Sequence, residues 1–358
     1  MKQYTKETVA REILEDPDIA KYMNIFVSDE IFSNITEEYL DKTLRELERV
    51  LEMPWGGPFI PELLLDGAKR VRELTEEKRF AFVPLWNNSG SEEFIPDMNK
   101  NNKANVCLMY LRNKNDSFSG KKRPAALICP GGGYELLAVT NEGVDYAERM
   151  EEAGYASFVL FYRVSPEHYP EPQKDLALAI KYLRANADEY GIDPERILIM
   201  GSSAAGHLCA SESAYYHEID HILMEDIQRN HPELSDRYKT ISARADMVCL
   251  AYPVIDFMQY AHEPSFQALT GGNEVLREKL SVQNYITKEF PKAFLWACQD
   301  DPLVPYQNCV CMGKALDDAG VDCCVRIYPQ GGHGCGLAYG TSAQSWMDEM
   351  LAFLSDTL

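Results

Sequence analysis

The sequence predicts an α/β fold with a mostly parallel central sheet, helices on both faces, and an additional N-terminal helical segment. From residue 79 onward, short apolar runs alternate with longer amphipathic stretches, which is the strand–helix rhythm of a parallel sheet. Residues 1–78 show charged, helix-like patterns without that rhythm. We therefore expect two parts, 1–78 and 79–358, in a chain whose 358 residues can bury a substantial core.

The predicted strands are short apolar runs bounded by turn residues. They lie at residues 80–86, 106–111, 125–128, 156–162, 197–200, 247–252, 293–297 and 322–328. Amphipathic stretches between them predict helices near residues 144–153, 174–190 and 343–354. The acidic stretch 215–242 interrupts the alternation, and we expect it to be an irregular insertion.

Two helices are expected in the N-terminal part. Thr36 can cap the first, because Glu37 and Glu38 then lie in its first turn and favour the helix dipole. This helix carries one apolar stripe, formed by Leu40, Leu44, Leu47 and Leu51. A break at residues 54–58 precedes a second helix that begins at Pro61. The apolar faces could cap a functional site, pack on the flank of the sheet or form a homo-oligomer contact, and the sequence leaves these alternatives open.

The charge balance argues against two classes of partner. The formal net charge is -21, so we expect neither nucleic acid nor an anionic membrane surface as a partner, because both are polyanions. Residues 1–16 are charged and contain no apolar signal region, and no run is long enough to span a bilayer. We therefore expect a cytoplasmic protein with reduced thiols.

Ten cysteines raise the question of a metal site. The group Cys309, Cys311, Cys323 and Cys324 does not have the spacing of a zinc finger or a zinc ribbon. Cys309 instead shares one helical face with Met312, and Cys323 and Cys324 fall in a predicted strand. We expect these side chains to be core thiols, and we expect no metal and no organic cofactor.

The most informative stretch is Gly201-Ser202-Ser203-Ala204-Ala205, between a predicted strand and a predicted helix. A serine nucleophile at such a sharp turn needs small residues two positions before and after it, because the backbone folds back on itself. Gly201 and Ala205 meet that need, and Ser203 is then the exposed hydroxyl. The N–H of Ala204 would face a developing oxyanion. A strand–helix junction that is merely rich in small residues is the alternative.

A second constellation, Cys129-Pro-Gly-Gly-Gly-Tyr134, directly follows a predicted strand. Three glycines allow positive φ angles and a close approach of the backbone to a ligand. Two N–H groups of this loop, with that of Ala204, would form an oxyanion hole. A dinucleotide or phosphate loop is less favoured, because the stretch lacks G-x-G-x-x-G and Gly-Lys-Ser/Thr. A plain glycine turn is the other alternative.

Two histidines could serve as the general base. His333, in Gly331-Gly-His-Gly334, lies in a flexible loop after the last predicted strand, where it can reach a serine at the neighbouring turn. His207 lies four residues after Ser203 on the following helix, so its side chain should point away from the hydroxyl. We therefore expect His333 to be the base and His207 to be structural.

The remaining position is an acid that orients the base. Asp300 and Asp301 follow the predicted strand at 293–297, so either carboxylate could serve. Asp256, after the preceding predicted strand, is a weaker candidate. An ordinary acidic turn is the alternative, because the whole chain is strongly negative.

From about residue 80 to the end, these pieces together resemble the esterases and lipases of the α/β-hydrolase superfamily. The resemblance is greatest to acetylxylan-esterase-like and xylanase-associated carboxylesterases. It rests on motifs in a fixed order: Pro130-Gly-Gly-Gly-Tyr134, Glu142-Gly143, Tyr162-Arg163, Ser203-Ala-Ala-Gly-His-Leu208, Tyr252-Pro-Val254, Asp301-Pro-Leu-Val-Pro305 and Gly331-Gly-His-Gly334. Two positions depart from the family pattern, since Ala205 replaces a glycine and Cys129-Pro130 replaces a histidine. Residues 1–78 have no counterpart in it.

The resemblance implies an α/β-hydrolase fold and a serine ester hydrolase with Ser203, Asp301 and His333 as its triad. The chain order of these three residues is that of the superfamily. Asp301 is preferred to Asp300 because the family's acid lies three residues before the valine of its conserved Val-Pro pair.

The resemblance also implies Gly132, Gly133 and Ala204 as oxyanion-hole donors, and a small ester substrate with a short acyl group, notably acetyl on a carbohydrate. We expect the acyl group to lie in a tight pocket near Tyr134. Two alternatives are a serine peptidase of the oligopeptidase type, which normally carries a larger cap or propeller, and a catalytically silent binding protein with this fold.

Overall fold

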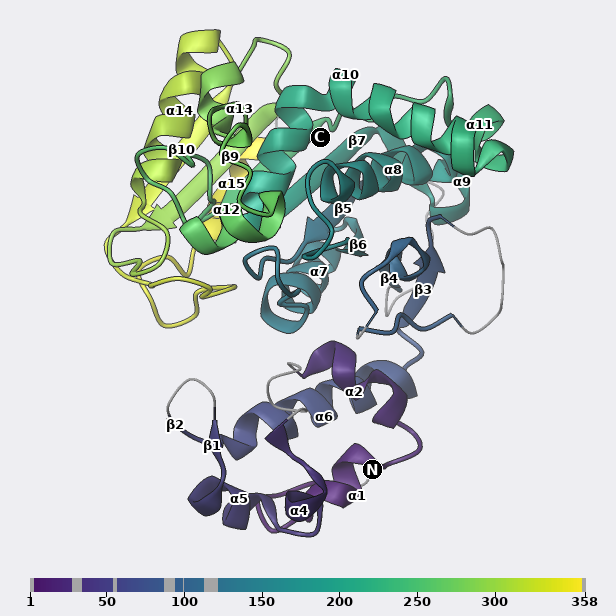
Figure 1. Ribbon diagram of the computed structural model, residues 1–358, viewed down its shortest axis with the longest axis vertical. Coiled ribbons are helices and arrows are strands. Elements are labelled where there is room, and N and C mark those ends of the chain that lie inside the picture. Colours follow the sequence, from purple (N-terminus) through teal and green to yellow (C-terminus); the bar gives the residue numbers. More distant parts are fainter. Residues whose placement is uncertain are drawn as a thin grey trace. The chain divides into compact units, whose positions relative to one another are not determined.

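The computed structural model describes residues 3–27, 34–53, 57–86, 94–98, 100–112 and 122–355. The chain divides into two compact units, Met1–Ala81 and Phe82–Leu358, and each is described here by itself (Figure 1). Within the described ranges, no helix has both the length and the apolar character needed to cross a membrane.

The first unit is built from short helices and one longer helix. Its elements are α1 (Ala10–Leu14), α2 (Ala20–Phe26), α4 (Glu37–Leu40), α5 (Leu44–Val50), β1 (Glu52–Met53), β2 (Gly57–Pro58) and α6 (Pro61–Glu76). The predicted helix at Pro61 is confirmed, and its apolar face is buried. The single helix expected after Thr36 is wrong, because α4 ends after one turn and Thr43 starts α5. Thr43 and Glu46 there form a reciprocal capping box.

The second unit is organised on one sheet. The described strands of this sheet are β3 (Phe80–Pro84), β4 (Cys107–Leu111), β5 (Arg123–Cys129), β6 (Ala156–Phe161), β7 (Ile192–Ser202), β8 (Met247–Ala251), β9 (Lys292–Cys298) and β10 (Cys323–Tyr328). The first two residues of β3 fall in the first unit. They lie in the order β10-β9-β8-β7-β5-β6-β4-β3. Neighbouring strands from β10 to β6 are parallel, and β4 pairs antiparallel with β6. The predicted mostly parallel sheet is confirmed.

Helices cover this sheet. They are α7 (Asp145–Glu152), α8 (Glu171–Ala185), α9 (Ala187–Tyr190), α10 (Ala204–Asn230), α11 (Pro232–Tyr238), α12 (Glu263–Thr270), α13 (Leu276–Lys279), α14 (Gln307–Ala319) and α15 (Trp346–Leu354), with shorter turns η1 (Lys103–Asn105), η2 (Thr140–Val144) and η3 (Val282–Tyr285). Helices α8 and α10 pack on each other and on β7, whereas α7 packs on β5 and β6 (Figure 1). Helices α14 and α15 both pack on β9.

The expectation of an irregular insertion at residues 215–242 is wrong. Helix α10 continues to Asn230 through a kink at Tyr215, and α11 follows directly. The missed signal is the spacing of Ile219, Leu223 and Ile227, which lie four residues apart and are fully buried. The acidic residues between them reduced the apparent apolar character of the stretch without interrupting its buried face.

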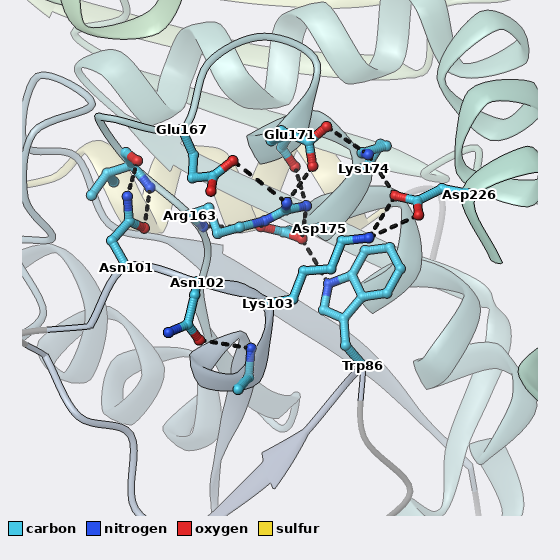
Figure 2. A network of polar contacts seen from close by, with 12 residues as sticks. Trp86, Asn101, Asn102, Lys103, Arg163, Glu167, Glu171, Lys174, Asp175 and Asp226 are labelled. Carbon is cyan, nitrogen blue, oxygen red and sulfur yellow. Dashed lines mark hydrogen bonds and ion pairs between the residues drawn. The ribbon is translucent and has the colours of Figure 1, made fainter. Parts of the chain in front are cut away.

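Charged groups link α8, α10 and the segment before β4 (Figure 2). We call this group the flank network, and it comprises Trp86, Lys103, Arg163, Lys174, Asp175 and Asp226. Arg163 donates to both carboxylate oxygens of the fully buried Asp175, each at 2.8 Å. Asp226 of α10 accepts from Lys103 at 2.8 Å and from Lys174 at 2.6 Å. The network joins elements that are distant in sequence through paired, fully charged groups.

The loops after the parallel strands meet at one edge of the sheet. Strands β5, β7, β8, β9 and β10 run in the same direction, so their carboxyl ends lie together, which is where open α/β sheets place their sites. These loops carry the Gly-rich stretch 130–134, Ser203, Asp256, Asp301 and His333. The topology therefore gathers the candidate residues that the sequence analysis selected.

Candidate active site

Ser203 occupies the sharp turn between β7 and α10. Its backbone has φ 54° and ψ -122°, a strained conformation that costs about 1–3 kcal/mol for a residue with a side chain. Gly201 is required here, because a Cβ at that position would lie 2.1 Å from the carbonyl oxygen of Ala205. Ala205 fits where the family pattern has glycine. The turn thus has the geometry that the sequence predicted.

The structure brings Ser203, His333 and Asp301 together in one hydrogen-bonded line. His333 Nε2 lies 2.8 Å from Ser203 Oγ, and His333 Nδ1 lies 2.7 Å from Asp301 Oδ2. An ionised carboxylate can only accept, so the Nδ1–H donates to Asp301 and Nε2 is free to accept the Ser203 proton. Asp301 Oδ1 accepts the N–H groups of Leu303 and Val304, both at 2.9 Å, which orients the carboxylate toward the imidazole.

The other two acids have different positions. Asp300 accepts the N–H groups of Gly331 and Gly332, at 3.0 and 2.9 Å, so it holds the loop that carries the histidine. Asp256 accepts N–H groups of its own loop, including that of Met258 at 2.8 Å. Neither carboxylate has the contact with the imidazole that Asp301 makes.

The Gly-rich loop lies against Ser203. A Cβ on Gly131 would come within 3.0 Å of Ser203 Cβ, so only a glycine permits this approach. Gly132 and Gly133 have φ angles of 131° and 67°, and in the described part of the chain neither N–H has an acceptor. Ala204 is the first residue of α10, where an N–H has no partner within the helix. These three N–H groups are available for an oxyanion.

The structure corrects the expected substrate contact at Tyr134. This side chain is fully buried, and its hydroxyl is 2.9 Å from His207 Nδ1. His207 Nε2 in turn lies 2.8 Å from the carbonyl oxygen of Leu280, and burial lowers the His207 pKa to about 4. A neutral His207 thus donates to Leu280 and accepts from Tyr134. The buried Tyr134 offers no surface to a substrate, and the two contacts of His207 agree with the structural role expected for it.

Glu142 is a buried carboxylate to which the sequence analysis gave no role. Its Oε2 accepts the Gly131 N–H at 2.8 Å, and its Oε1 accepts the Tyr252 hydroxyl at 2.9 Å. Burial raises the pKa of Glu142, while Tyr252, Gly131 and the charge of His333 lower it. The available signal was its place in the motif Glu142-Gly143, and this motif does not show which residues the carboxylate contacts.

Comparison with known proteins places the chain in a family. The model of the BD-FAE family matches residues 110–316, more than half of the chain. The chain belongs to the BD-FAE family. The resemblance to α/β-hydrolase esterases, drawn from the motifs, is thereby confirmed at the level of the family and the fold.

The proteins that are similar in sequence to this BD-FAE chain include the following two. It is 30% identical over 267 residues to endo-1,4-beta-xylanase B of Butyrivibrio fibrisolvens, covering 73% of this chain and 38% of that protein. It is 29% identical over 275 residues to the acetylxylan esterase of Xylanibacter ruminicola, covering 75% of this chain and 50% of that protein. The chain thus spans half or less of the length of these relatives.

The fold is also shared with solved structures. The acetyl ester-xyloside bifunctional hydrolase from Caldicellulosiruptor lactoaceticus matches with a TM-score of 0.64 and 30% identity, over 77% of this chain and 96% of that chain. The carboxylesterase Cest-2923 from Lactobacillus plantarum matches with a TM-score of 0.56 and 25% identity, over 70% and 92% of the two chains. Both matches agree with the parallel sheet described above.

Proposed function

We propose that this chain is a serine carboxylesterase that hydrolyses short-chain acyl esters, chiefly acetyl esters, through an acyl-enzyme. The observation that supports it most is the line of contacts from Ser203 through His333 to Asp301, at 2.8 and 2.7 Å. An imidazole held in this way takes the serine proton as the oxygen attacks, and the carboxylate stabilises the imidazolium that forms.

Acylation begins when Ser203 Oγ attacks the ester carbonyl carbon and His333 Nε2 takes the hydroxyl proton. The N–H groups of Gly132, Gly133 and Ala204 would donate to the oxyanion of the tetrahedral intermediate. The intermediate collapses when His333 protonates the leaving alcohol, which leaves the acyl group on Ser203. Water then attacks the acyl carbon while His333 takes its proton. The acid departs and Ser203 regains its proton.

The proposed substrates are small acetyl esters, with acetylated oligosaccharides as the natural class. Support comes from two similar proteins, an acetylxylan esterase and an acetyl ester-xyloside bifunctional hydrolase. The net charge of -21 also disfavours an anionic lipid surface as the place of action.

A series of p-nitrophenyl esters tests the acyl preference. We expect kcat/KM to be greatest for acetyl or propionyl and to fall by orders of magnitude at eight carbons, because each methylene that a tight pocket excludes costs about 1–3 kcal/mol. Acetate release from acetylated xylo- and manno-oligosaccharides then tests the alcohol. A maximum at eight carbons or beyond would contradict the short-acyl proposal, and faster cleavage of peptide amides would favour the peptidase alternative.

A further inference from the structure

Glu142 is a buried acid of the site that lies outside the Ser203–His333–Asp301 line. It belongs to η2, a five-residue π-helical turn that leads into α7, and π-helical turns occur frequently at functional sites. The residue is only 3% exposed. A buried carboxylate without partners would be strongly destabilising, so the contacts of this one deserve a physical account.

Those contacts reach two separate loops of the site. Through Gly131, Glu142 fixes the Gly-rich loop at the point where that loop touches the nucleophile. Through Tyr252 it reaches the loop that carries His333 and Gly336, which we call the histidine loop. The Tyr252 hydroxyl donates to Glu142 and also accepts the Gly336 N–H at 3.3 Å. The Tyr252 ring packs edge-on against the imidazole of His333, with the ring centroids 5.1 Å apart.

Neighbouring groups complete this arrangement, which we call the site network: Ser202, Glu142, Tyr146, Tyr252 and the backbone of Gly336. Tyr146 donates to the Gly336 carbonyl at 3.2 Å and accepts from the Ser202 hydroxyl at 3.3 Å. Apart from Glu142, every member is an uncharged hydroxyl or a backbone group. The negative charge of Glu142 therefore has no cation within its own network to neutralise it.

Tyr252 separates Glu142 from the base, since its hydroxyl donates to Glu142 and its ring packs on the imidazole of His333. Burial raises the Glu142 pKa, and the charge of His333 is among the influences that lower it. The titratable groups near Glu142 include Tyr146, Tyr162, Tyr252 and Cys335, and those near His333 include Asp301 and His262. Burial raises the pKa of each of these tyrosines, and the contact with Cys298, followed by burial, raises the pKa of Cys335, so all four groups are neutral near pH 7.

We propose that Glu142 is a positioning residue. It keeps the Gly-rich loop and the histidine loop in fixed positions relative to each other, and it stabilises the protonated form of His333 during proton transfer. This inference rests on the proposed function, since it assigns Glu142 to the support of that triad. The proton moves only between Ser203, His333 and the leaving group or water. Glu142 contributes its negative charge and two acceptor oxygens, and exchanges no proton.

Glu142→Gln separates charge from shape. Its amide oxygen can accept the Gly131 N–H, and its amide N–H can donate to the Tyr252 oxygen, so the loops stay linked while the charge is lost. The matched control is Glu212→Gln, because Glu212 is also fully buried but lies on α10 outside both networks. Glu142→Asp keeps the charge and shortens the reach.

The experiment measures kcat, KM and the pH dependence of kcat/KM with p-nitrophenyl acetate. For Glu142→Gln we expect kcat to fall roughly 10–100-fold, with KM within about twofold, because the lost interaction strengthens in the transition state. The acidic limb of the pH profile should move to lower pH, since a nearby anion no longer favours the imidazolium. Glu212→Gln should match the wild type in all three quantities, and Glu142→Asp should keep the acidic limb in place.

The outcomes separate this inference from the proposed function. If the wild type does not cleave the ester, or if Ser203→Ala still does, the proposed function is wrong. If the activity depends on Ser203 but Glu142→Gln has wild-type kcat and an unmoved acidic limb, the role of Glu142 is wrong. A lower kcat with an unmoved limb contradicts the charge role.

A second variant tests the proposal even if the first one does not fold. If Glu142→Gln does not fold, Tyr252→Phe removes only the hydroxyl that joins Glu142 to the histidine loop. It should lower kcat by about 3–10-fold, the effect of one hydrogen bond. An unchanged kcat in Tyr252→Phe would overturn the link between Glu142 and that loop.

Discussion

The flank network and the site network are two buried polar clusters of the same unit, and they are built in opposite ways. In the flank network each carboxylate meets full positive charges, as Arg163 does at Asp175 (Figure 2). In the site network one carboxylate, Glu142, meets only hydroxyl and backbone donors. Paired opposite charges hold elements together and cancel one another. A carboxylate with neutral donors keeps a charge that can act on a reacting neighbour. The two networks should therefore respond differently to mutation.

The largest expected effect is on activity alone. Ser203→Ala should lower kcat by about 10³-fold or more and leave the melting temperature within a few degrees, because the serine contributes chemistry and little packing. Ser202→Ala is the matched control, since it removes a neighbouring hydroxyl whose bond to Tyr146 lies in the site network. It should lose far less activity. The opposite ranking of the two variants would place the nucleophile at Ser202.

The two adjacent acids provide the next test. Asp301→Asn should lower kcat by about 10²–10⁴-fold, because an amide cannot both accept from His333 Nδ1–H and keep its present orientation. Asp300→Asn should lose much less, since Asp300 accepts only backbone N–H groups of the histidine loop. Steady-state kinetics with p-nitrophenyl acetate distinguishes them. Equal and mild losses would instead indicate Asp256 as the acid.

The flank network should behave in the opposite sense, with a loss of stability and unchanged chemistry. Asp175→Ala leaves the buried guanidinium of Arg163 without its main partner, which costs about 3–5 kcal/mol of unfolding free energy. Urea denaturation measures this loss. The kcat per folded molecule should stay within about twofold of the wild type. A large drop in kcat at full folding would show that the flank network also serves the site.

The smallest expected effect concerns Glu212, a third buried carboxylate. Within the described residues neither of its oxygens has a hydrogen-bond partner, and burial raises its pKa well above the usual range. A folded-state pKa above the unfolded one gives stability that is present below about pH 4.3 and is lost as pH rises toward the folded value. Glu212→Gln removes this titration. Its stability relative to the wild type should rise with pH by up to about 1.4 kcal/mol per unit.

Thermal melts at pH 5 and pH 8.5 measure that difference. The melting temperature of Glu212→Gln should exceed that of the wild type by more at pH 8.5 than at pH 5. A difference that does not change with pH would contradict this prediction. It would mean that another group stabilises the ionised Glu212 carboxylate in the folded protein.

Local signals carried most of the fold and the core of the site. The strand before Ser203 and the small residues around it are local requirements of one turn, so the sequence displays them directly. The sequence also predicted that His333 and Asp301 lie near Ser203, because each is in a loop after a predicted strand, and parallel strands bring such loops to one edge. The buried face of α10 was missed because acidic residues separate Ile219 from the next buried positions.

Side-chain direction was harder to predict than chain path. The sequence led us to expect an acyl pocket near Tyr134, but the inward direction of its ring toward His207 depends on packing between distant segments. The role of Glu142 has the same origin, since its partners Gly131 and Tyr252 are 11 and 110 residues away in the chain. Contacts of this kind leave no spacing pattern that a single sequence could reveal.

The most direct test of the central claim is covalent labelling with diisopropyl fluorophosphate, followed by peptide mapping. An activated serine should take up one phosphoryl group per chain at Ser203, in step with the loss of esterase activity, while Ser203→Ala stays unlabelled. The Glu142→Gln variant should be labelled at the same residue but more slowly. A phosphoryl group on another residue, or an active enzyme that the reagent neither labels nor inhibits, would contradict the account.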